Sequence, residues 1–418
     1  MAMEGLESRA AAVIPWLIGK GLRSNSRQDL LNSFCEKLVE LGVPLWRFHL
    51  AQRAYHPKFG GIGYNWTRMD GISHEHYERR ETPLEAWLQS PFYVLLEQNM
   101  EVFQSDLTGE DLTRFPLLRD LKDQGGTEYL AMALRFTEDE PPFDPNNPSE
   151  GVLCSWTSDG AEGFSGEDKA LIQALYPALG LALKSMSNRQ MATDLLQTYL
   201  GRDPGQRVLS GEFQRGSSTE IDAVIGLFDL KGFTSLAGEL PGPELIEMLN
   251  DYFGIAVAAT HGHGGNILKF LGDGMLVMFN LGSIEKDAQA ALDAAAELCR
   301  NISLRNEQRL ALGLPITDWT LALHAGKILY GNIGAENRLD FTVIGPAVNQ
   351  TARIADMHRS VGQNMIFSSV VQRAVTAGKH DMVSLGRYML RGVADPLELF
   401  TVYRPNGAMP NLSPYVED

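Results

Sequence analysis

The sequence is poor in cysteine, in basic charge and in long apolar runs, and each shortage narrows the classes of protein it can belong to. The three cysteines, Cys35, Cys154 and Cys299, lie far apart among 418 residues and have no metal-ligand spacing, which fits a reducing compartment. A formal net charge of −16 argues against a nucleic-acid partner bound through phosphates. No stretch approaches the roughly 18 apolar residues that cross a membrane. We therefore predict a cytoplasmic protein without a membrane span.

What is present is a globular composition, with 44% hydrophobic and 21% charged residues. Hydrophobic periodicity is interrupted by the stretch GRDPGQRVLSGEFQRGSS, which is rich in Gly, Pro, Ser and Arg. We predict a first domain at 1–185, a helix and linker at 186–216, a second domain at 217–405 and a C-terminal tail at 406–418.

The first domain shows a helix, strand-like runs and a long exit helix. Apolar residues share one helical face between Leu30 and Leu41. Strand-like runs follow at LWRFHLAQRAY, GIGYNW, EYLAMALRF and GVLCSWTS. The exit helix has Ser165 as its expected N-cap, an apolar stripe from Ile172 to Met186, and Pro177, which should kink the helix or mark its start.

This order resembles a GAF-type sensor domain of the α/β class over roughly residues 30–185. The resemblance implies a regulatory domain that responds to a small molecule, which the sequence does not identify. His74 and His76 could chelate a metal, although no further ligand lies nearby. Four aromatic residues could line a pocket, but aromatic residues in strands are more often core. They are Trp46, Tyr64, Trp66 and Trp87.

The second domain alternates strands and helices. AVIGLF suits a central strand, and helical periods follow at ELIEMLNDYFGIAVAATHG and DAQAALDAAAELCRNISLRNEQR. A hairpin lies between those helices, and strands near WTLALHAG and DFTVIG precede a helix near AVNQTARIADMHR. This order predicts an α+β domain with helices on one face of a mainly antiparallel sheet.

Two aspartates stand at turns where strands end. Asp229 follows the strand AVIGLF and precedes a turn into a helix, and Asp273 lies in a Gly-Asp-Gly turn between two apolar strands. If these strands are neighbours, the two carboxylates converge and can hold divalent cations. Lys269, four residues before Asp273, should point to the same side of its strand. It serves either Asp273 or something bound, since a buried charge needs a partner.

A third cluster pairs an amide with a guanidinium. Asn349 and Arg353 are four residues apart on a predicted helix and so share one face. Arginine supplies a permanent positive fork that suits phosphoryl oxygens, and asparagine can orient a sugar oxygen. An Asn and an Arg at this spacing are common in proteins, so the pair alone does not identify a function.

Together these clusters resemble the catalytic domain of the class III nucleotidyl cyclases, from about Asp222 to Tyr403. The matching stretches are FDLKGFT, GGNILKFLGDG, LHAGKILYGNIG and FTVIGPAVNQTAR. The resemblance implies a ferredoxin-like βααββαβ domain in which Asp229, Asp273 and the backbone carbonyl of Leu230 bind two Mg²⁺ or Mn²⁺ ions. It places Phe233 and Thr234 in the substrate-binding segment.

The resemblance also assigns the remaining roles. Lys269 and Thr342 correspond to the purine-reading positions, and Thr342 marks a bacterial subgroup where many other members carry Asp. Asn349 and Arg353 correspond to the catalytic pair that orients the ribose and stabilises the transition state. Because guanylate cyclases of the family typically carry Glu at the lysine position, Lys269 favours ATP. Pro346, where a polar residue often stands, departs from the pattern.

The function so implied is an adenylate cyclase that makes 3′,5′-cyclic AMP and pyrophosphate from ATP as a homodimer regulated by its first domain. Three alternatives stay open: a nucleotide-binding signalling module without turnover, a sensor or scaffold protein, and a guanylate cyclase. A diguanylate cyclase is disfavoured because no GG[DE]EF motif occurs.

Overall fold

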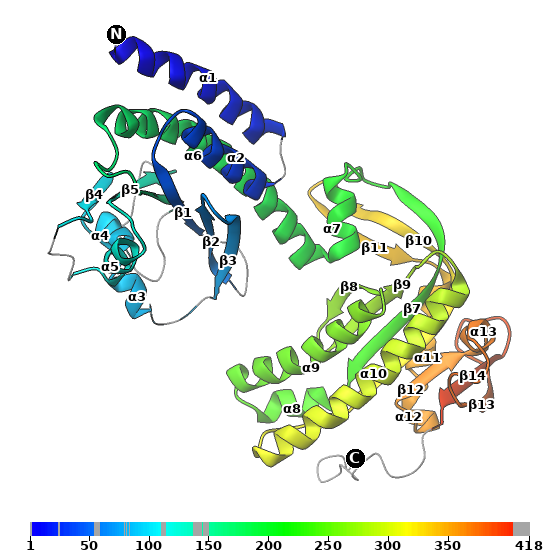
Figure 1. The fold of residues 1–418 in the computed structure, drawn as a ribbon. Coiled ribbons are helices and arrows are strands. Elements are labelled where there is room, and N and C mark those ends of the chain that lie inside the picture. The colour runs from blue at the N-terminus through cyan, green and yellow to red at the C-terminus, as the bar shows by residue number, and fades with distance from the viewer. Residues whose placement is uncertain are drawn as a thin grey trace. The chain divides into compact units, whose positions relative to one another are not determined.

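The computed structural model describes residues 2–23, 26–53, 59–78, 80, 82, 84–109, 114–136, 144 and 150–403, with side chains from residue 9 onward. The predicted tail at 406–418 lies outside the described residues. The chain forms two compact units, Met1–Leu195 and Leu196–Asp418 (Figure 1). Within the described part of the chain, no helix combines the length and apolar composition that crossing a membrane requires.

The first unit is built on one six-stranded antiparallel sheet in the order β3-β2-β1-β6-β5-β4. The strands are β1 (Leu45–Arg53), β2 (Phe59–Thr67), β3 (Gly71–Glu78), β4 (Val102–Asp106), β5 (Glu128–Arg135) and β6 (Gly151–Ser158). The helices are α1 (Ala2–Arg23), α2 (Arg27–Glu40), α3 (Glu85–Leu88), α4 (Pro91–Glu97), α5 (Pro116–Asp123) and α6 (Gly166–Leu200). The four strand-like runs of the sequence are β1, β2, β5 and β6, whereas β3 and β4 were not predicted.

The two faces of this sheet bury different side chains. Phe48 and Leu50 of β1 pack with α2 and α6 in the main core of the unit. Because side chains alternate along a strand, Arg47 and His49 lie on the opposite face, where the ring of His49 stacks on Phe92 of α4. The sheet thus separates an apolar core from a face that carries polar groups.

The exit helix begins as predicted. The N–H of Asp168 donates to Ser165 Oγ over 3.1 Å, and the N–H of Ser165 donates to Asp168 Oδ2 over 3.0 Å, which is a reciprocal cap. The helix then continues through Pro177 to Leu200. Pro177 therefore does not mark a helix start, which was one of the two outcomes predicted for it.

The second unit contains an eight-stranded sheet in the order β13-β14-β12-β10-β7-β9-β8, with β11 paired to β10. The strands are β7 (Ser218–Leu230), β8 (Asn266–Leu271), β9 (Gly274–Phe279), β10 (Trp319–Ala335), β11 (Arg338–Ile344), β12 (Met365–Ser368), β13 (Met382–Tyr388) and β14 (Leu397–Val402). The helices are α7 (Arg202–Leu209), α8 (Phe233–Glu239), α9 (Gly242–Gly262), α10 (Ile284–Ala311), α11 (Pro346–Ala355), α12 (His358–Val361) and α13 (Ser369–Ala374). From β7 to β10 the elements follow the predicted order βααββαβ, which confirms the fold class.

Helices cover both faces of this sheet, so the prediction of a single covered face was wrong. Val224 and Phe228 of β7 pack with α9 and α10, whereas Ala223 and Ile225 pack on the other face with Ala347 of α11. The reason is visible in the sequence, because an unbroken apolar run such as AVIGLF suits a strand buried on both sides.

Candidate functional site

The two predicted aspartates meet where β7 ends beside the β8–β9 turn. Asp229 lies opposite Gly274 in the sheet, and the N–H of Leu230 donates to the Asp273 carbonyl over 3.2 Å. A Cβ atom on Gly274 would lie 2.9 Å from Asp229 Oδ1 and 2.7 Å from the Phe228 carbonyl oxygen. Glycine at this position therefore leaves the space that the Asp229 carboxylate occupies.

The electrostatics of Asp229 reflect this crowding. Asp229 is exposed, but partial burial by the surrounding protein, and next the negative charge of Asp273, raise the pKa of Asp229 to about 6. A divalent cation between two such carboxylates would favour their ionised forms. Oxygen donors of this kind are those that Mg²⁺ and Mn²⁺ prefer, so the residues present fit the implied metal ions.

The side chains supply only part of a coordination shell. Among the described residues, no group of three or more His, Cys, Asp or Glu side chains is arranged to hold a metal. Cations held by Asp229 and Asp273 would therefore take their other ligands from backbone carbonyl groups, water or a substrate phosphate, as Mg²⁺ commonly does. The Leu230 carbonyl remains a predicted ligand.

The predicted substrate-binding segment, which contains Phe233 and Thr234, follows Asp229 directly in the chain. Gly232, with φ of 65°, precedes α8, and Phe233 and Thr234 are the first two residues of that helix. Their N–H groups precede the first intrahelical hydrogen bonds, which the Ser235 and Leu236 N–H groups donate to the Gly232 carbonyl. These early N–H groups are the ones a helix leaves without internal partners.

Lys269 has a partner that the sequence interpretation missed. Its Nζ atom forms an ion pair with Asp340 of β11, and among the described residues no hydrogen bond or ion pair joins it to Asp273. A β-bulge between Ile267 and Lys269 breaks the regular alternation of β8. Asp340 lies two residues before Thr342, so both point to one side of β11. Lys269 and Thr342 are thereby brought to the same region.

Asn349 and Arg353 share an exposed face of α11, as predicted. Arg353 Nη1 lies 3.3 Å from Asp356 Oδ2 on the same helix. Within the described residues, no hydrogen bond or ion pair joins Lys269, Asn349 or Arg353 to Asp229 or Asp273. One chain therefore presents two sets of groups: the aspartate pair, and the groups on β8, β11 and α11.

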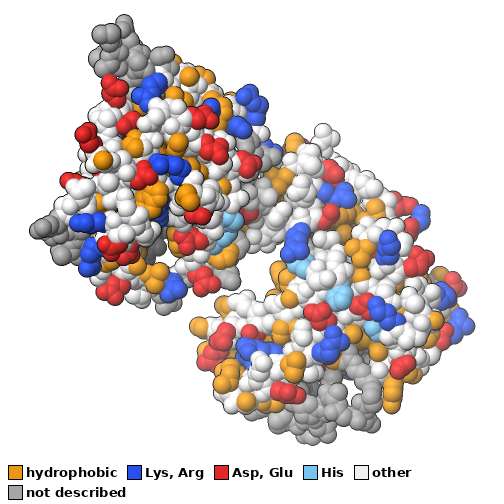
Figure 2. All heavy atoms as spheres, viewed as in Figure 1, with side chains coloured by type: hydrophobic (Ala, Val, Ile, Leu, Met, Phe, Trp, Pro, Cys, Tyr) orange, Lys and Arg blue, Asp and Glu red, His pale blue; other side chains and the backbone are white. Residues whose placement is uncertain are grey.

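The candidate residues of the first unit lie in different environments. Tyr64 and Trp66 are buried in its core and Trp46 packs at the edge of a second cluster, while Trp87 lines a pocket. His74 contacts Gln28, and its ring centroid lies 5.5 Å from that of His76. Both histidines are exposed. Figure 2 shows acidic and basic side chains interspersed on the visible face of each unit.

Curated relatives match just over half of this chain. A protein of Mycobacterium tuberculosis (strain CDC 1551) is 28% identical over 258 residues, which are 61% of this chain and 44% of that protein. A Mycobacterium bovis protein is 29% identical over 238 residues, 56% of this chain and 42% of its own length. Both are described as uncharacterized. This chain thus spans less than half the length of those relatives.

Solved structures resemble part of this chain. The adenylyl cyclase CyaB from P. aeruginosa is 24% identical, with a TM-score of 0.42, over 46% of this chain and all of that one. The guanylyl cyclase Cya2 is 32% identical, with a TM-score of 0.39, over 44% of this chain and 93% of that one. Residues 217–403 match the family described as the adenylate and guanylate cyclase catalytic domain.

Proposed function

We propose, from the premise that residues 217–403 belong to the class III adenylate and guanylate cyclase catalytic domain family, that this protein converts ATP to 3′,5′-cyclic AMP and pyrophosphate. The observation that carries the proposal is the convergence of Asp229 and Asp273 at the end of β7. In this reaction the ribose 3′-oxygen forms a bond to the α-phosphorus, the 3′-hydroxyl proton is lost, and the bond to the departing pyrophosphate breaks.

Each group of residues has its own role in this reaction. Asp229, Asp273 and the Leu230 carbonyl would hold two Mg²⁺ or Mn²⁺ ions, which supply charge neutralisation at the triphosphate and activation of the 3′-oxygen. The N–H groups of Phe233 and Thr234 face the phosphates. Asn349 orients the ribose, and Arg353 stabilises negative charge that grows on the phosphoryl oxygens, an effect worth about 3 kcal/mol.

The choice of ATP rests on the groups near β11. The ammonium of Lys269 can only donate, which matches the acceptor at N1 of adenine, and the Thr342 hydroxyl can accept from the exocyclic amine. Guanine presents a donor at N1 and would need an acceptor there. Asp340, which pairs with Lys269, is such an acceptor, so guanylate cyclase activity is the second candidate.

The separation of the two sets of groups supports a homodimer. In the sheet register Asp229 lies opposite Thr320, while Thr342 lies opposite Gly331, so the two are attached toward opposite ends of β10. We propose that the aspartate pair of one chain faces Lys269, Asn349 and Arg353 of a second copy. A two-fold dimer then completes two equivalent sites, and a monomer completes none.

The test is a nucleotide cyclisation assay of the purified chain with ATP and GTP, each with Mg²⁺ or Mn²⁺. We expect cyclic AMP from ATP and at least tenfold less cyclic GMP from GTP. Asp229→Asn and Asp273→Asn should each abolish product formation. Asp222→Asn is the matched control, because Asp222 is an exposed carboxylate of the same strand. Nucleotide binding without product would leave the non-catalytic signalling module, and preference for GTP would establish the guanylate cyclase.

A further inference from the structure

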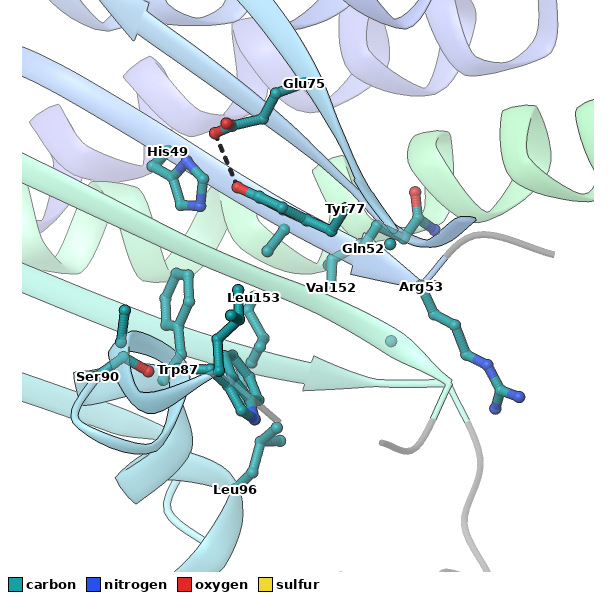
Figure 3. Close-up of a pocket in the computed structure, with 18 of the residues that line it drawn as sticks. His49, Gln52, Arg53, Glu75, Tyr77, Trp87, Ser90, Leu96, Val152 and Leu153 are labelled. Atoms are coloured by element: carbon teal, nitrogen blue, oxygen red, sulfur yellow. Dashed lines mark hydrogen bonds between the residues drawn. The ribbon is translucent and has the colours of Figure 1, made fainter. Parts of the chain in front are cut away.

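A pocket of about 510 Å³ opens on the α4 face of the first unit's sheet. Its residues come from β1, β2, β3, β5 and β6, from α3, α4 and α5, and from the connections beside them (Figure 3). All of them belong to the first unit, so the pocket is distinct from the cyclase groups. Its volume is within the range that encloses a small organic molecule.

One side of the pocket is apolar. Trp87, Leu96 and Leu153 gather there, as Figure 3 shows. Phe92 adds an aromatic ring, which is stacked against His49 at a centroid distance of 5.8 Å and an interplanar angle of 25°. These side chains offer flat and branched surfaces against which an apolar body can pack.

The other side carries a fixed polar network. Asn65 Nδ2 donates to Glu75 Oε1 over 3.0 Å, and the Tyr77 hydroxyl donates to the same oxygen over 2.8 Å. Because the amide of Asn65 donates to a carboxylate, its Oδ1 atom is the acceptor for Arg47 Nη2 at 2.9 Å and His49 Nδ1 at 2.8 Å. His49 therefore carries its proton on Nδ1. The network holds Arg47 in place across three strands.

Arg47 has no directly paired counter-charge in this network. Among the described residues, its guanidinium has one hydrogen-bond partner, the neutral amide of Asn65, and forms no ion pair. The Arg47 side chain is partly buried, and that burial lowers its pKa. Glu75 is exposed and hydrogen-bonds to Asn65, and its charge acts on Arg47 through space without forming an ion pair. A guanidinium has five N–H donors, and a desolvated cation is costly unless it is paired.

We propose that this pocket binds a small organic anion, whose ring-bearing apolar body packs against Trp87 and Leu153 and whose acidic group is bound by Arg47. The guanidinium supplies a planar fork for a carboxylate, sulfonate or phosphate group.

Two fluorescent probes of nearly the same shape test the proposal on the full chain. They are 8-anilinonaphthalene-1-sulfonate, an aromatic anion, and N-phenyl-1-naphthylamine, which lacks only the sulfonate. We expect saturable binding of the anion with one site per chain. Arg47→Met should raise the Kd of the anionic probe at least tenfold, about 1.4 kcal/mol, and leave that of the neutral probe within twofold. Trp87→Ala should weaken both probes.

Controls separate the pocket from general surface binding. Arg119→Met removes an exposed arginine of α5 that does not line the pocket, and it should change neither Kd. Arg47→Lys keeps the charge and loses the fork, so it should bind the anion with intermediate affinity if Arg47→Met fails to fold. Equal loss of both probes in a folded Arg47→Met protein, an unchanged Kd for the anion, or binding that never saturates would each overturn the proposal.

Discussion

At the scale of single residues, the ion pair between Lys269 and Asp340 changes how the lysine must be understood. Lys269 is exposed, and its ammonium group pairs with the carboxylate of Asp340 on β11. Asp340 is two residues from Thr342, so both side chains lie on the same side of that strand. Asp340 is therefore a positioning residue in our proposal. It holds the purine-reading ammonium where adenine would meet it.

Replacing Asp340 should affect substrate binding more than turnover. In Asp340→Asn the lysine keeps its charge and loses its ion-pair partner, an exposed interaction worth up to about 1 kcal/mol. We expect the KM for ATP to rise about threefold to fivefold, with kcat within twofold, in steady-state cyclase assays. Glu336→Gln, an exposed carboxylate in the turn that joins β10 to β11, should change neither constant. A fall in kcat at constant KM would contradict the positioning role.

His324 makes the second unit sensitive to acid. The side chain is buried and contacts Ser368 Oγ through Nδ1 at 2.8 Å, so it is a hydrogen-bonded histidine of the core. Burial lowers its pKa from 6.5 to about 4, partly opposed by a hydrogen bond with Gln350. Between these values the unfolded chain binds the proton and the folded chain does not. The stabilisation is therefore complete above about pH 6.5 and is lost as the pH falls toward 4.

A substitution isolates this contribution. Wild-type protein should lose about 2 kcal/mol of unfolding free energy at His324 between pH 7.5 and pH 5, and His324→Gln should not show that part of the loss. Urea unfolding at both pH values can be followed through 5-fluorotryptophan at Trp319, because residues 196–418 contain no other tryptophan. Equal pH dependence in both proteins would exclude a neutral buried His324.

At the scale of elements, the β8–β9 hairpin positions the aspartate pair by close backbone approach. Gly274→Ala would place a Cβ atom 2.9 Å from Asp229 Oδ1 and 2.7 Å from the Phe228 carbonyl oxygen, so the carboxylate must shift. We expect cyclase activity to fall at least tenfold and the Mg²⁺ concentration for half-maximal rate to rise. Gly238→Ala in α8, where a Cβ atom meets nothing within 4 Å, should retain activity. Full activity in Gly274→Ala would contradict the close fit.

The sequence predicted those elements whose local pattern agrees with their environment. The stripe of α2, the cap at Ser165 and the strand-like run of β1 are local features of the sequence, and each is confirmed. The strand β3 carries the polar run SHEHYE on an exposed edge, so it offers no period of two in hydrophobicity. Its pairing with β2 depends on the sheet as a whole.

The candidate site, too, was predicted only where its features are local in the sequence. Asp229 and Asp273 are local features of two strand ends, and the resemblance together with the turn residues was enough to predict their convergence. The partnership of Lys269 with Asp340 depends on a bulge in β8 and on a hairpin 71 residues away in sequence. Arg47 and Asn65 become neighbours only through the register of β1 and β2. Such pairs carry no signal in a local pattern.

At the scale of the whole molecule, α6 offers the regulatory route that we propose. The helix runs without a break from Gly166 to Leu200, and its first half packs in the core of the first unit. An anion in the Arg47 pocket could alter cyclase output only if it bound two states of the protein with different affinities. The domain boundaries predicted at 185 and 217 stay predictions.

The shared site makes a prediction that only an assembly of two chains can satisfy. Asp229→Asn removes the metal-binding side of both sites in a homodimer, and Arg353→Ala removes the opposite side, so each variant alone should be inactive. In an equal mixture after subunit exchange, half of the dimers pair one chain of each kind and contain one intact site. We therefore expect recovery of up to about one quarter of wild-type activity.

The control is a mixture of Asp229→Asn with Asp273→Asn chains. Both changes damage the same side of the site, so each mixed dimer has two defective aspartate pairs and no activity should return. Exchange itself can be followed by energy transfer between differently labelled chains. If exchange is complete and the first mixture stays inactive, the aspartate pair and Arg353 do not act on one nucleotide across two chains. The groups of β7 and α11 would then have to act on a nucleotide within one chain.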